Sequence, residues 1–434
     1  MQSYIDDFRE AIRAAIPIHL RIVNFFFLIL PFSLVTGPFL PDLFLSIVAF
    51  YFLVISLKDK IFDYYKNYAV YAFFVFYFWI IFSGLLSNHP YQSLIDYNGP
   101  IFYIRYLFFV LGIAYLLKKT PKLIKIFCIH LLCLLIFVVI DGYLMWLTGT
   151  NILGFQSPSA RVTGIFNDEE ILGHFLSHTT PLAFALSVYI FGIKPKKIIL
   201  YMSLLVVSET LIFISNDRAG FLKIFQFTLL LIFLSNHFKL FRVISFILSL
   251  LIISFIIQIS KESKERYSDT LNQVSSTKIP FMPWTPNHEE HFKITIEMFK
   301  KSPITGQGPQ AFRIYCDTPE YIQGCTNHPH NYYFQTIGEL GVVGLILLSI
   351  AIIYVTQKLF RQFYNLWVKK NINSPYLSDH LVALFSLAFV LLWPLIPHQS
   401  FYNNWLNAYY FLPFGFIYYF LFLESEDSKS NIKL

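Results

Sequence analysis

The chain has 434 residues, of which 56% are hydrophobic and 14% are charged, and its formal net charge is +7. Because soluble globular domains carry roughly 25% charged residues, this composition excludes a soluble protein. Lys and Arg at the cytoplasmic ends of membrane helices explain a positive net charge and attract anionic membrane lipid, so no nucleic acid partner is implied.

Twelve apolar runs follow one another along the chain, and each approaches the roughly 20 residues that a helix needs to cross a bilayer. The sequence therefore predicts an all-α polytopic membrane protein, with residues 1–434 forming one integral membrane domain. Residues 1–21 are polar and amphipathic, and they do not resemble a cleavable signal peptide. The predicted helices cover approximately residues 22–40, 41–57, 68–87, 98–117, 126–148, 171–192, 198–215, 219–235, 243–260, 334–357, 380–397 and 405–423.

The distribution of Lys and Arg predicts the orientation of these helices, because short cytoplasmic loops carry an excess of positive charge. Basic residues gather before the first predicted helix and after the second, fourth, sixth, eighth, tenth and twelfth. We therefore expect both termini in the cytoplasm. The one long hydrophilic segment, 261–333, then lies on the outer side of the membrane.

Arg105 lies in the fourth predicted helix, about two turns from its outer end. A charge at this depth is costly, so it either snorkels to the interface or faces a cavity. The sequence leaves both interpretations open, and in the second of them Arg105 contacts an anion.

Arg161 precedes a group of carboxylates, Asp168, Glu169 and Glu170, where the sixth predicted helix begins. The helix dipole explains a carboxylate in the first turn, and this is our interpretation of Asp168. Few other cations occur in the short outer loops, so we take Arg161 as a candidate anion ligand and Glu169 as a supporting residue.

Arg218 lies in the turn between the seventh and eighth predicted helices, next to Ala219 and Gly220. Small residues let a ligand approach the backbone, and a guanidinium group can bind phosphate through two parallel hydrogen bonds, which Lys cannot do. The alternative is a snorkelling Arg at a helix end. We favour phosphate binding.

The outer segment 261–333 is expected to begin as an irregular stretch, 261–287. An amphipathic helix is predicted over 288–301, where it could lie on the outer leaflet or act as a lid. Cys316 and Cys325 lie in the same segment, and an outer compartment permits a disulfide between them. His328 and His330 lack the usual spacing of zinc ligands to Cys325, so no metal site is predicted.

The outer polar residues together suggest one kind of chemistry. Fixed guanidinium groups suit a diphosphate whose leaving oxygen gains charge, and a histidine that titrates near neutral pH suits general base work on a sugar hydroxyl. Both are expected in group transfer from a diphosphate-linked lipid. The candidate residues are Arg161, Arg218 and His330, with Arg105, Glu169, His288 and Arg313 as further members.

The spacing around His330 extends this interpretation. His330 and Asn331 are followed, after nine residues, by Gly341-Val342-Val343-Gly344. This matches the H-[NSQ]-x9-G-x-x-[GTY] signature of the O-antigen ligase and O-antigen polymerase family, and it stands at the entry to a predicted helix. The chain resembles this family from about residue 150 onward, also in the stretches ARVTGIFNDEEILG, SNDRAGFL and EMFKKSPITGQGPQAF.

The resemblance implies a GT-C-like inverting glycosyltransferase of the bacterial inner membrane, with its site facing the periplasm. Neither a metal nor another cofactor is implied, and the donor is a glycan on undecaprenyl diphosphate. His330 falls on the catalytic histidine of the family, and Arg218 on an arginine that holds the diphosphate. Arg161 matches a polymerase-like pattern and is the second candidate ligand.

Other motif positions receive supporting or structural roles from the same resemblance. Asn331 is a supporting residue, and Gly341 and Gly344 are structural. The family often has an Arg at the start of the loop helix, where this chain has His288. If that Arg is a diphosphate ligand, Lys293 and Arg313 are the nearest replacements.

The family transfers glycans to different acceptors. A polymerase passes the growing chain to another lipid-linked repeat and is expected to work with a chain-length regulator, whereas a ligase passes it to lipid A-core or, in related enzymes, to a protein. The stretch RVTGIFNDEEILG and the variant HPHN favour a polymerase, with a ligase as the alternative. A transporter or flippase for the same lipid would place charges deep in many helices, whereas the charges of this chain, apart from Arg105, lie at the outer ends of the predicted helices.

Overall fold

The computed structural model describes the helical body of the protein and most of its loops. The described residues are 8–9, 16–96, 99–157, 161–237, 239–276, 284–321, 325–371 and 375–424.

A helix forms within each of the twelve apolar runs of the sequence. The corresponding helices are α2 (Ile18–Ser33), α3 (Phe39–Lys58), α4 (Tyr68–Leu85), α6 (Arg105–Lys119), α7 (Leu123–Thr148), α8 (Leu172–Phe191), α9 (Pro195–Ile214), α10 (Arg218–Leu234), α11 (Lys239–Ile259), α15 (Tyr332–Phe363), α16 (Asp379–Leu391) and α17 (Asn404–Tyr418). Short helices fill the connections: η1 (Phe62–Tyr65), α5 (Pro90–Leu94), η2 (Pro100–Ile104), η3 (Gly164–Phe166) and α14 (Phe312–Tyr315), while η5 (Tyr364–Val368) and η6 (Tyr419–Leu423) extend α15 and α17.

The protein is therefore all-helical in the part of the chain that the structure describes. Eight of its helical segments are long and apolar enough to cross a membrane. They are Phe39–Lys58, Tyr68–Leu85, Pro100–Lys119, Leu123–Thr148, Pro195–Ile214, Lys239–Ile259, Tyr332–Val368 and Asn404–Leu423. The shorter apolar helices α2 and α16 pack on α7 and α8 respectively.

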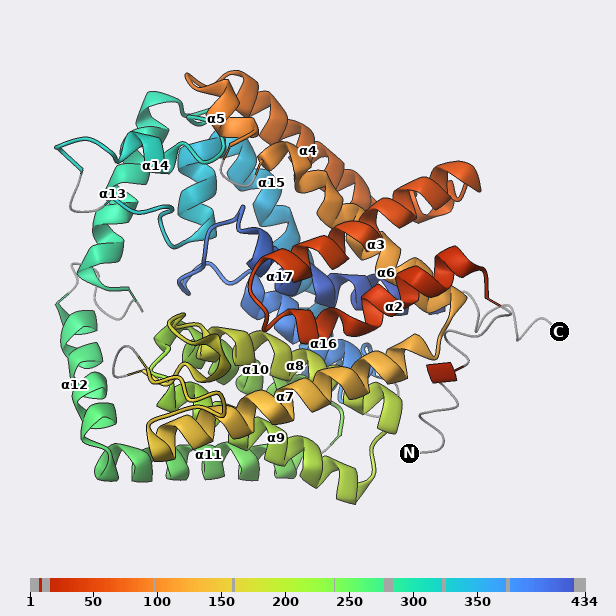
Figure 1. Ribbon diagram of the computed structural model, residues 1–434, viewed down its shortest axis with the longest axis vertical. Coiled ribbons are helices and arrows are strands. Elements are labelled where there is room, and N and C mark those ends of the chain that lie inside the picture. The colour runs from red at the N-terminus through yellow and green to blue at the C-terminus, as the bar shows by residue number, and fades with distance from the viewer. Residues whose placement is uncertain are drawn as a thin grey trace.

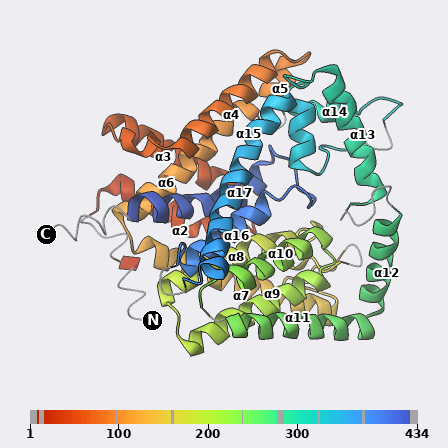
Figure 2. The same ribbon diagram turned by 180° about the vertical axis from the view of Figure 1, so that it is seen from behind.

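The helices form two groups that meet at α16 and α17 (Figure 1). One group contains α7 to α11, and the other contains α3, α4, α6 and α15, as the reverse view also shows (Figure 2). Helix α17 packs on α6, and α8 packs on α16, so the two groups share a continuous apolar core. This core fixes the ends of the helices that surround the site described below.

Two helices, α12 (Lys261–Ser275) and α13 (Pro286–Lys301), run along one face between α11 and α15 (Figure 1). The prediction of an irregular stretch over 261–287 is wrong for α12. Ser260 caps this helix by accepting a hydrogen bond from the backbone N–H of Ser263, and Lys261 pairs with Glu265 one turn later. These local signals were missed because the segment has no apolar stripe, whereas α13 lies where an amphipathic helix was predicted.

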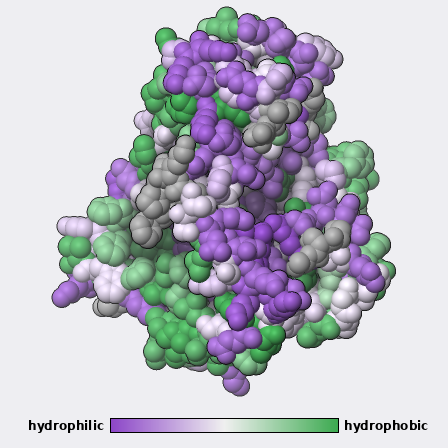
Figure 3. Space-filling model, turned by 90° about the vertical axis from the view of Figure 1, so that its left-hand side faces the viewer, coloured by the Kyte–Doolittle hydropathy of each residue, from purple (hydrophilic) through white to green (hydrophobic). Residues whose placement is uncertain are grey.

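The face that carries α12 and α13 differs from the sides of the bundle. Hydrophilic residues gather over its centre, and the surface is hollowed there, while apolar residues lie toward the edges (Figure 3). The sides include α11, whose outward residues, such as Leu251 and Phe255, are largely exposed. This pattern suits a helix bundle that meets lipid at its sides and water at this face.

Candidate active site

A cavity with a volume of about 660 Å³ opens under α12 and α13. Its walls come from the loop before α8, from the first turns of α8 and α10, from α12, and from the start of α13. His330, at the entry to α15, and the segment 397–399 complete it. Segments that are distant in the sequence therefore share one pocket.

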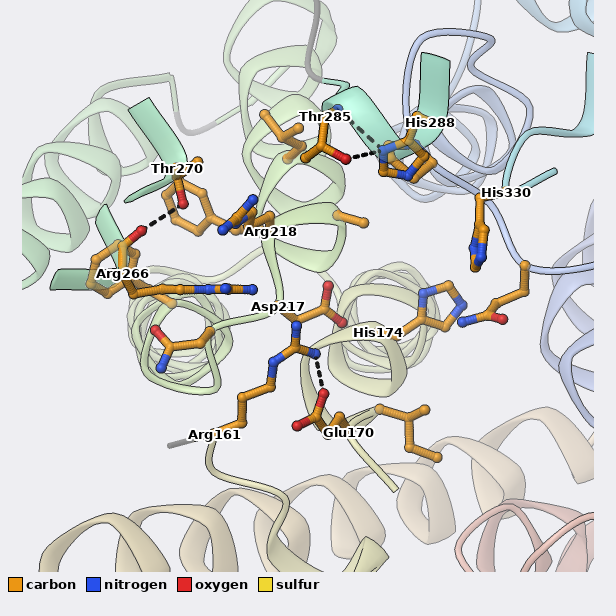
Figure 4. A pocket seen from close by; sticks show the side chains of 18 of the residues that line it. Arg161, Glu170, His174, Asp217, Arg218, Arg266, Thr270, Thr285, His288 and His330 are labelled. Carbon is orange, nitrogen blue, oxygen red and sulfur yellow. Dashed lines mark hydrogen bonds and ion pairs between the residues drawn. The ribbon is translucent and has the colours of Figure 1, made fainter. Parts of the chain in front are cut away.

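Three arginines line one side of the pocket, Arg161, Arg218 and Arg266, and we call them the arginine wall (Figure 4). Arg161 pairs with Glu170 at 2.8 Å, and Arg218 donates from Nη1 to the side chain of Gln273 at 2.8 Å. The Nε and Nη2 atoms of Arg218 have no hydrogen-bond partner among the described residues. This edge of the guanidinium group is the fork that binds a phosphate through two hydrogen bonds.

The members of the arginine wall repel one another. The charge of Arg161 acts on both Arg218 and Arg266. Burial, followed by the charge of Arg161, lowers the pKa of Arg266 from its usual value, although an arginine remains charged at neutral pH. A concentration of cations of this kind is stabilised by an anionic ligand.

Asp217 and Gly220, on either side of Arg218, have structural roles in the folded protein. Asp217 caps α10, because its carboxylate accepts a hydrogen bond from the backbone N–H of Gly220 at 2.9 Å. A Cβ atom on Gly220 would lie 2.7 Å from the backbone of Gly173 in α8. Gly220 therefore serves the close packing of α8 and α10 rather than the approach of a ligand, which corrects the interpretation made from the sequence.

Four histidines line the other part of the pocket, His174, His288, His330 and His398, and we call them the imidazole wall. Figure 4 labels the first three of them. His330 adopts a left-handed backbone conformation, with φ of 54°. Its carbonyl accepts a hydrogen bond from the backbone N–H of His398 at 2.8 Å, which holds the two loops together. Within the described part of the chain, the ring nitrogens of His330 make no hydrogen bond, so they remain available to a substrate hydroxyl.

His330 lies among other imidazoles. Its ring centroid is 4.1 Å from that of His328, 5.4 Å from His291 and 5.9 Å from His288. Burial lowers the pKa of His330 to about 4, and the positive charges that His291 and His288 would carry add to this effect. His330 is therefore neutral at physiological pH, which is the state that a general base requires.

His288 is also neutral at physiological pH. Burial, His291 and Arg218 lower its pKa to about 4. Its Nδ1 atom accepts a hydrogen bond from the backbone N–H of Thr285, which completes the capping box of α13 and leaves the proton on Nε2. His288 therefore offers the pocket a neutral donor and does not replace the positive charge of an arginine.

Asn331 positions His330. Its side-chain oxygen caps α15 by accepting hydrogen bonds from the backbone N–H groups of Tyr333 and Phe334, and its Nδ2 donates to the carbonyl of Pro394 at 2.7 Å. The residue beside His330 thus ties the start of α15 to the segment that follows α16. An Asn before an apolar run is a readable capping signal.

The two motif glycines shape the break in α15. Gly341 has φ of 68°, and a Cβ atom there would lie 2.2 Å from the carbonyl oxygen of Ile304. At Gly344, a Cβ atom would lie 2.3 Å from the side chain of Leu340. The backbone of the loop after α13 docks on this break, where Gly308 donates to the carbonyl of Glu339 and Val342 to that of Pro303, both at 2.9 Å.

The outer loop has a small core of its own. Cys316 and Cys325 are joined by a disulfide, and Cys316 packs with Phe312 of α14 and with Ile294 and Met298 of α13. The disulfide closes the loop a few residues before His330. This small core connects α13 to the segment that carries the histidine.

Four charged residues expected near the site do not line the pocket. Arg105 pairs with Asp42 at 2.8 Å, Lys293 pairs with Glu290 on the exposed side of α13, and Glu169 is exposed. Arg313 lies near His328 and outside the pocket lining. The neighbouring carboxylate, Glu170, is the one that contacts Arg161.

Arg266 and His174 line the pocket but were missed in the sequence. Arg266 was passed over because its segment was interpreted as irregular, and it supplies the third arginine that was sought at Lys293 or Arg313. His174 stands in an apolar run, where a histidine is usually a buried core residue. One available signal was its position in the first turn of a helix whose preceding loop already carried a candidate arginine.

The described residues contain no group of three or more His, Cys, Asp or Glu side chains arranged as ligands for a metal ion.

Comparison with known proteins identifies the kind of protein to which this site belongs. Residues 201–349 match the model of the O-antigen ligase family, Wzy_C. The matched region includes Arg218, Arg266, His288, His330 and the glycines of the α15 break. None of the curated proteins compared with the chain matches it significantly.

The pocket and this match define a multi-pass membrane glycosyltransferase that uses a lipid-linked glycan. More particularly, the chain carries the O-antigen ligase domain that is shared by the polymerases and ligases of bacterial lipopolysaccharide synthesis. The family resemblance drawn from the sequence is confirmed. The match to this family supports glycan transfer, and we do not retain the transporter alternative.

Proposed function

We propose that the protein is an O-antigen or surface polysaccharide polymerase, an inverting and metal-independent enzyme. It transfers a glycan from undecaprenyl diphosphate to the non-reducing end of another lipid-linked repeat unit. The observation that carries this proposal is the meeting of three arginines and a neutral, unbonded histidine in one cavity. The arginines match a diphosphate, and the histidine matches a hydroxyl that must lose its proton.

In the proposed mechanism, the donor diphosphate lies against the arginine wall. His330 takes the proton from the acceptor hydroxyl as its oxygen attacks the anomeric carbon. The bond between that carbon and the phosphate oxygen breaks, and undecaprenyl diphosphate leaves with the electron pair. Fixed guanidinium groups stabilise the charge that develops on the leaving group without reorganisation.

The proposed orientation places this pocket on the periplasmic side of the inner membrane, with both termini in the cytoplasm and all twelve helices as spans. Its support is the position of the basic loops. Glu424, after α17, receives a hydrogen bond from Tyr189 near the end of α8, whereas the start of α8 lies at the pocket. The basic segment 194–197 therefore lies at the end of the bundle opposite the pocket. In this arrangement 261–333 is a periplasmic loop within a single domain.

Arg161 favours a polymerase over a ligase. It belongs to the stretch that resembles polymerases, and it lines the pocket beside Arg218. The alternative is a ligase that transfers the glycan to lipid A-core or to a protein. Its support is the description of the family whose model matches the chain. A chain-length regulator is the partner expected for a polymerase.

The test is the lipopolysaccharide banding pattern of a deletion strain complemented with the wild-type protein or with His330→Ala. A polymerase predicts that the deletion strain shows a band for a single repeat and no ladder, and that only the wild type restores the ladder. Loss of all glycan from lipid A-core, with long chains left on the lipid carrier, would instead establish a ligase. A normal ladder with His330→Ala would remove His330 from catalysis.

A further inference from the structure

A buried polar cluster forms part of the floor of the pocket, where His174 and His398 line it, and extends beneath this floor. It contains His174 and His178 of α8, Lys223 of α10, and His398. Lys223 is 0% exposed and His174 is 6% exposed, although His174 lines the pocket. The family signature and the three arginines assign no role to these residues.

Lys223 and His174 are arranged as a pair. The Nζ atom of Lys223 lies 3.3 Å from Nδ1 of His174. In its ammonium form a lysine has no acceptor, so Lys223 then donates to that nitrogen. When Nδ1 accepts, the ring carries its proton on Nε2. Among the described residues, Nε2 of His174 has no hydrogen-bond partner. The lysine therefore orients a donor that is left unused by the protein.

The position of the His174 ring shows which part of a bound substrate this N–H donor would contact. Figure 4 shows its imidazole between the side of the pocket that carries Arg161 and Asp217 and the side that carries His330. An atom bound there lies between the diphosphate and the base of the proposed reaction. The bond that breaks in glycan transfer joins those two parts of the substrate.

Lys223 is not neutralised as a structural ion pair. In the described part of the chain no carboxylate lies within salt-bridge distance of the Nζ atom of Lys223. The negative charge of Asp217 acts on Lys223 only from a greater distance. The ring of Tyr410 lies 6.0 Å away. A buried charge without a close counter-ion does not favour folding, and an ionisable residue inside a membrane protein points to a function. A negatively charged ligand atom would supply the missing counter-charge.

We propose that Lys223 and His174 form a charged hydrogen-bond relay that binds the phosphate oxygen next to the transferred sugar. This inference rests on the proposed function and names two further residues of its site. When the acceptor oxygen bonds to the anomeric carbon, the bond from that carbon to the phosphate oxygen breaks and its electron pair stays on the oxygen. Nε2–H of His174 stabilises this charge without transferring its proton, since the proton of the acceptor goes to His330.

A group that stabilises charge developing in the transition state affects kcat more than KM. Removal of one such donor typically costs about 100-fold to 1,000-fold in kcat. Lys223→Met keeps the length and helix propensity of the side chain and removes the charge. We expect it to lower kcat about 100-fold, to change the donor KM less than about threefold, and to leave thermal stability unchanged or higher.

A second pair of variants keeps the test decisive if Lys223→Met fails to fold. His174→Gln retains an N–H donor and an acceptor for Lys223, whereas His174→Leu retains neither. We expect His174→Leu to lose as much activity as Lys223→Met, and His174→Gln to recover part of it. The double variant Lys223→Met/His174→Leu should be no worse than either single variant, because the two residues act as a unit.

The matched control is Glu209→Gln. Glu209 is another buried ionisable residue, on α9, and its carboxylate accepts hydrogen bonds from Thr228 of α10 and Ser249 of α11. It does not line the pocket. Its variant should keep kcat and KM within about twofold of wild type, since its partners remain hydrogen-bonded and no pocket atom changes.

The experiment measures glycan transfer by the full-length protein in liposomes, from an undecaprenyl-diphosphate-linked donor, together with thermal unfolding. A wild-type protein that transfers no glycan would contradict the proposed function itself. Full activity of both Lys223→Met and His174→Leu, beside an active wild type, would overturn only the relay. A loss confined to acceptors with acidic sugars would also overturn it, because the anion at the floor would then be an acceptor carboxylate.

Discussion

The arginine wall and the imidazole wall face the same cavity but differ in charge and burial. Arg161 and Arg218 are partly exposed, and they contact Glu170 and Gln273 respectively. His330 and His288 are held neutral by burial and by their neighbouring imidazoles. Permanent charge is thus concentrated where an anion is expected to bind, and neutral nitrogen is kept where a proton must be accepted.

The two walls also come from different parts of the fold. The arginines lie before α8, at the start of α10 and on α12, whereas His288 and His330 lie on α13 and before α15. The consecutive helices α12 and α13 connect the two sides (Figure 1), and His174 of the imidazole wall comes from α8, directly after the loop that carries Arg161. A change at Arg218 or at His330 should nevertheless alter one step of the reaction and leave the opposite side of the pocket intact.

The largest effect is expected at His330. His330→Ala removes the proposed general base and should lower kcat by about 100-fold to 10,000-fold, with little change in the donor KM. Steady-state glycan transfer in liposomes measures this effect. His19→Ala is the control, since His19 is exposed on α2 and its ring contacts Tyr51. A kcat within a few-fold of wild type for His330→Ala would contradict the role of His330 as the general base.

Arg218 should give the next largest effect, on donor use. Hydrogen bonds to charged groups contribute about 1.5–3 kcal/mol, so Arg218→Ala should lower kcat/KM for the donor by roughly 10-fold to 100-fold. Arg218→Lys retains the charge without the fork and should fall between the alanine variant and wild type. Equal, full activity of both variants would show that Arg218 does not bind the diphosphate.

Arg266 tests whether the third arginine belongs to the same wall. Arg266→Gln should raise the donor KM about 10-fold, because one charged contact is lost while the side chain remains of similar length. Lys293→Gln is the matched control on the neighbouring helix, since Lys293 pairs with Glu290 and does not line the pocket. If Lys293→Gln raises the donor KM and Arg266→Gln does not, the replacement expected from the sequence is the correct one.

The smallest effect is expected from mild acid. Because the pKa of His330 lies at about 4, its neutral form persists as pH falls from 7 to 5 and is lost only near pH 4. Donor kcat/KM, which reports the free enzyme, should therefore change less than about twofold over this range. A histidine with an ordinary pKa near 6.5 would lose about 30-fold by pH 5, and a fall of that size would contradict the neutral imidazole wall.

Much of the fold could be predicted because its signals are local. Each apolar run became a helix because backbone hydrogen bonds must be satisfied within the segment in lipid. The amphipathic pattern predicted a helix over 288–301, which corresponds to α13, and the family spacing gave Gly341 a structural role. The helix α12 was not, since it is stabilised by a cap at Ser260 and by contacts such as that of Gln273 with Arg218.

The candidate site divides in the same way. The sequence by itself determined the class of the protein, the signature at His330, and two of the three arginines, because those residues stand in short motifs. Only the tertiary structure decided which other charges share the pocket. In the folded protein Arg105 pairs with Asp42 and does not line the pocket, whereas Arg266 does. It also placed Lys223 behind His174, since contacts between helices depend on packing that no local pattern encodes.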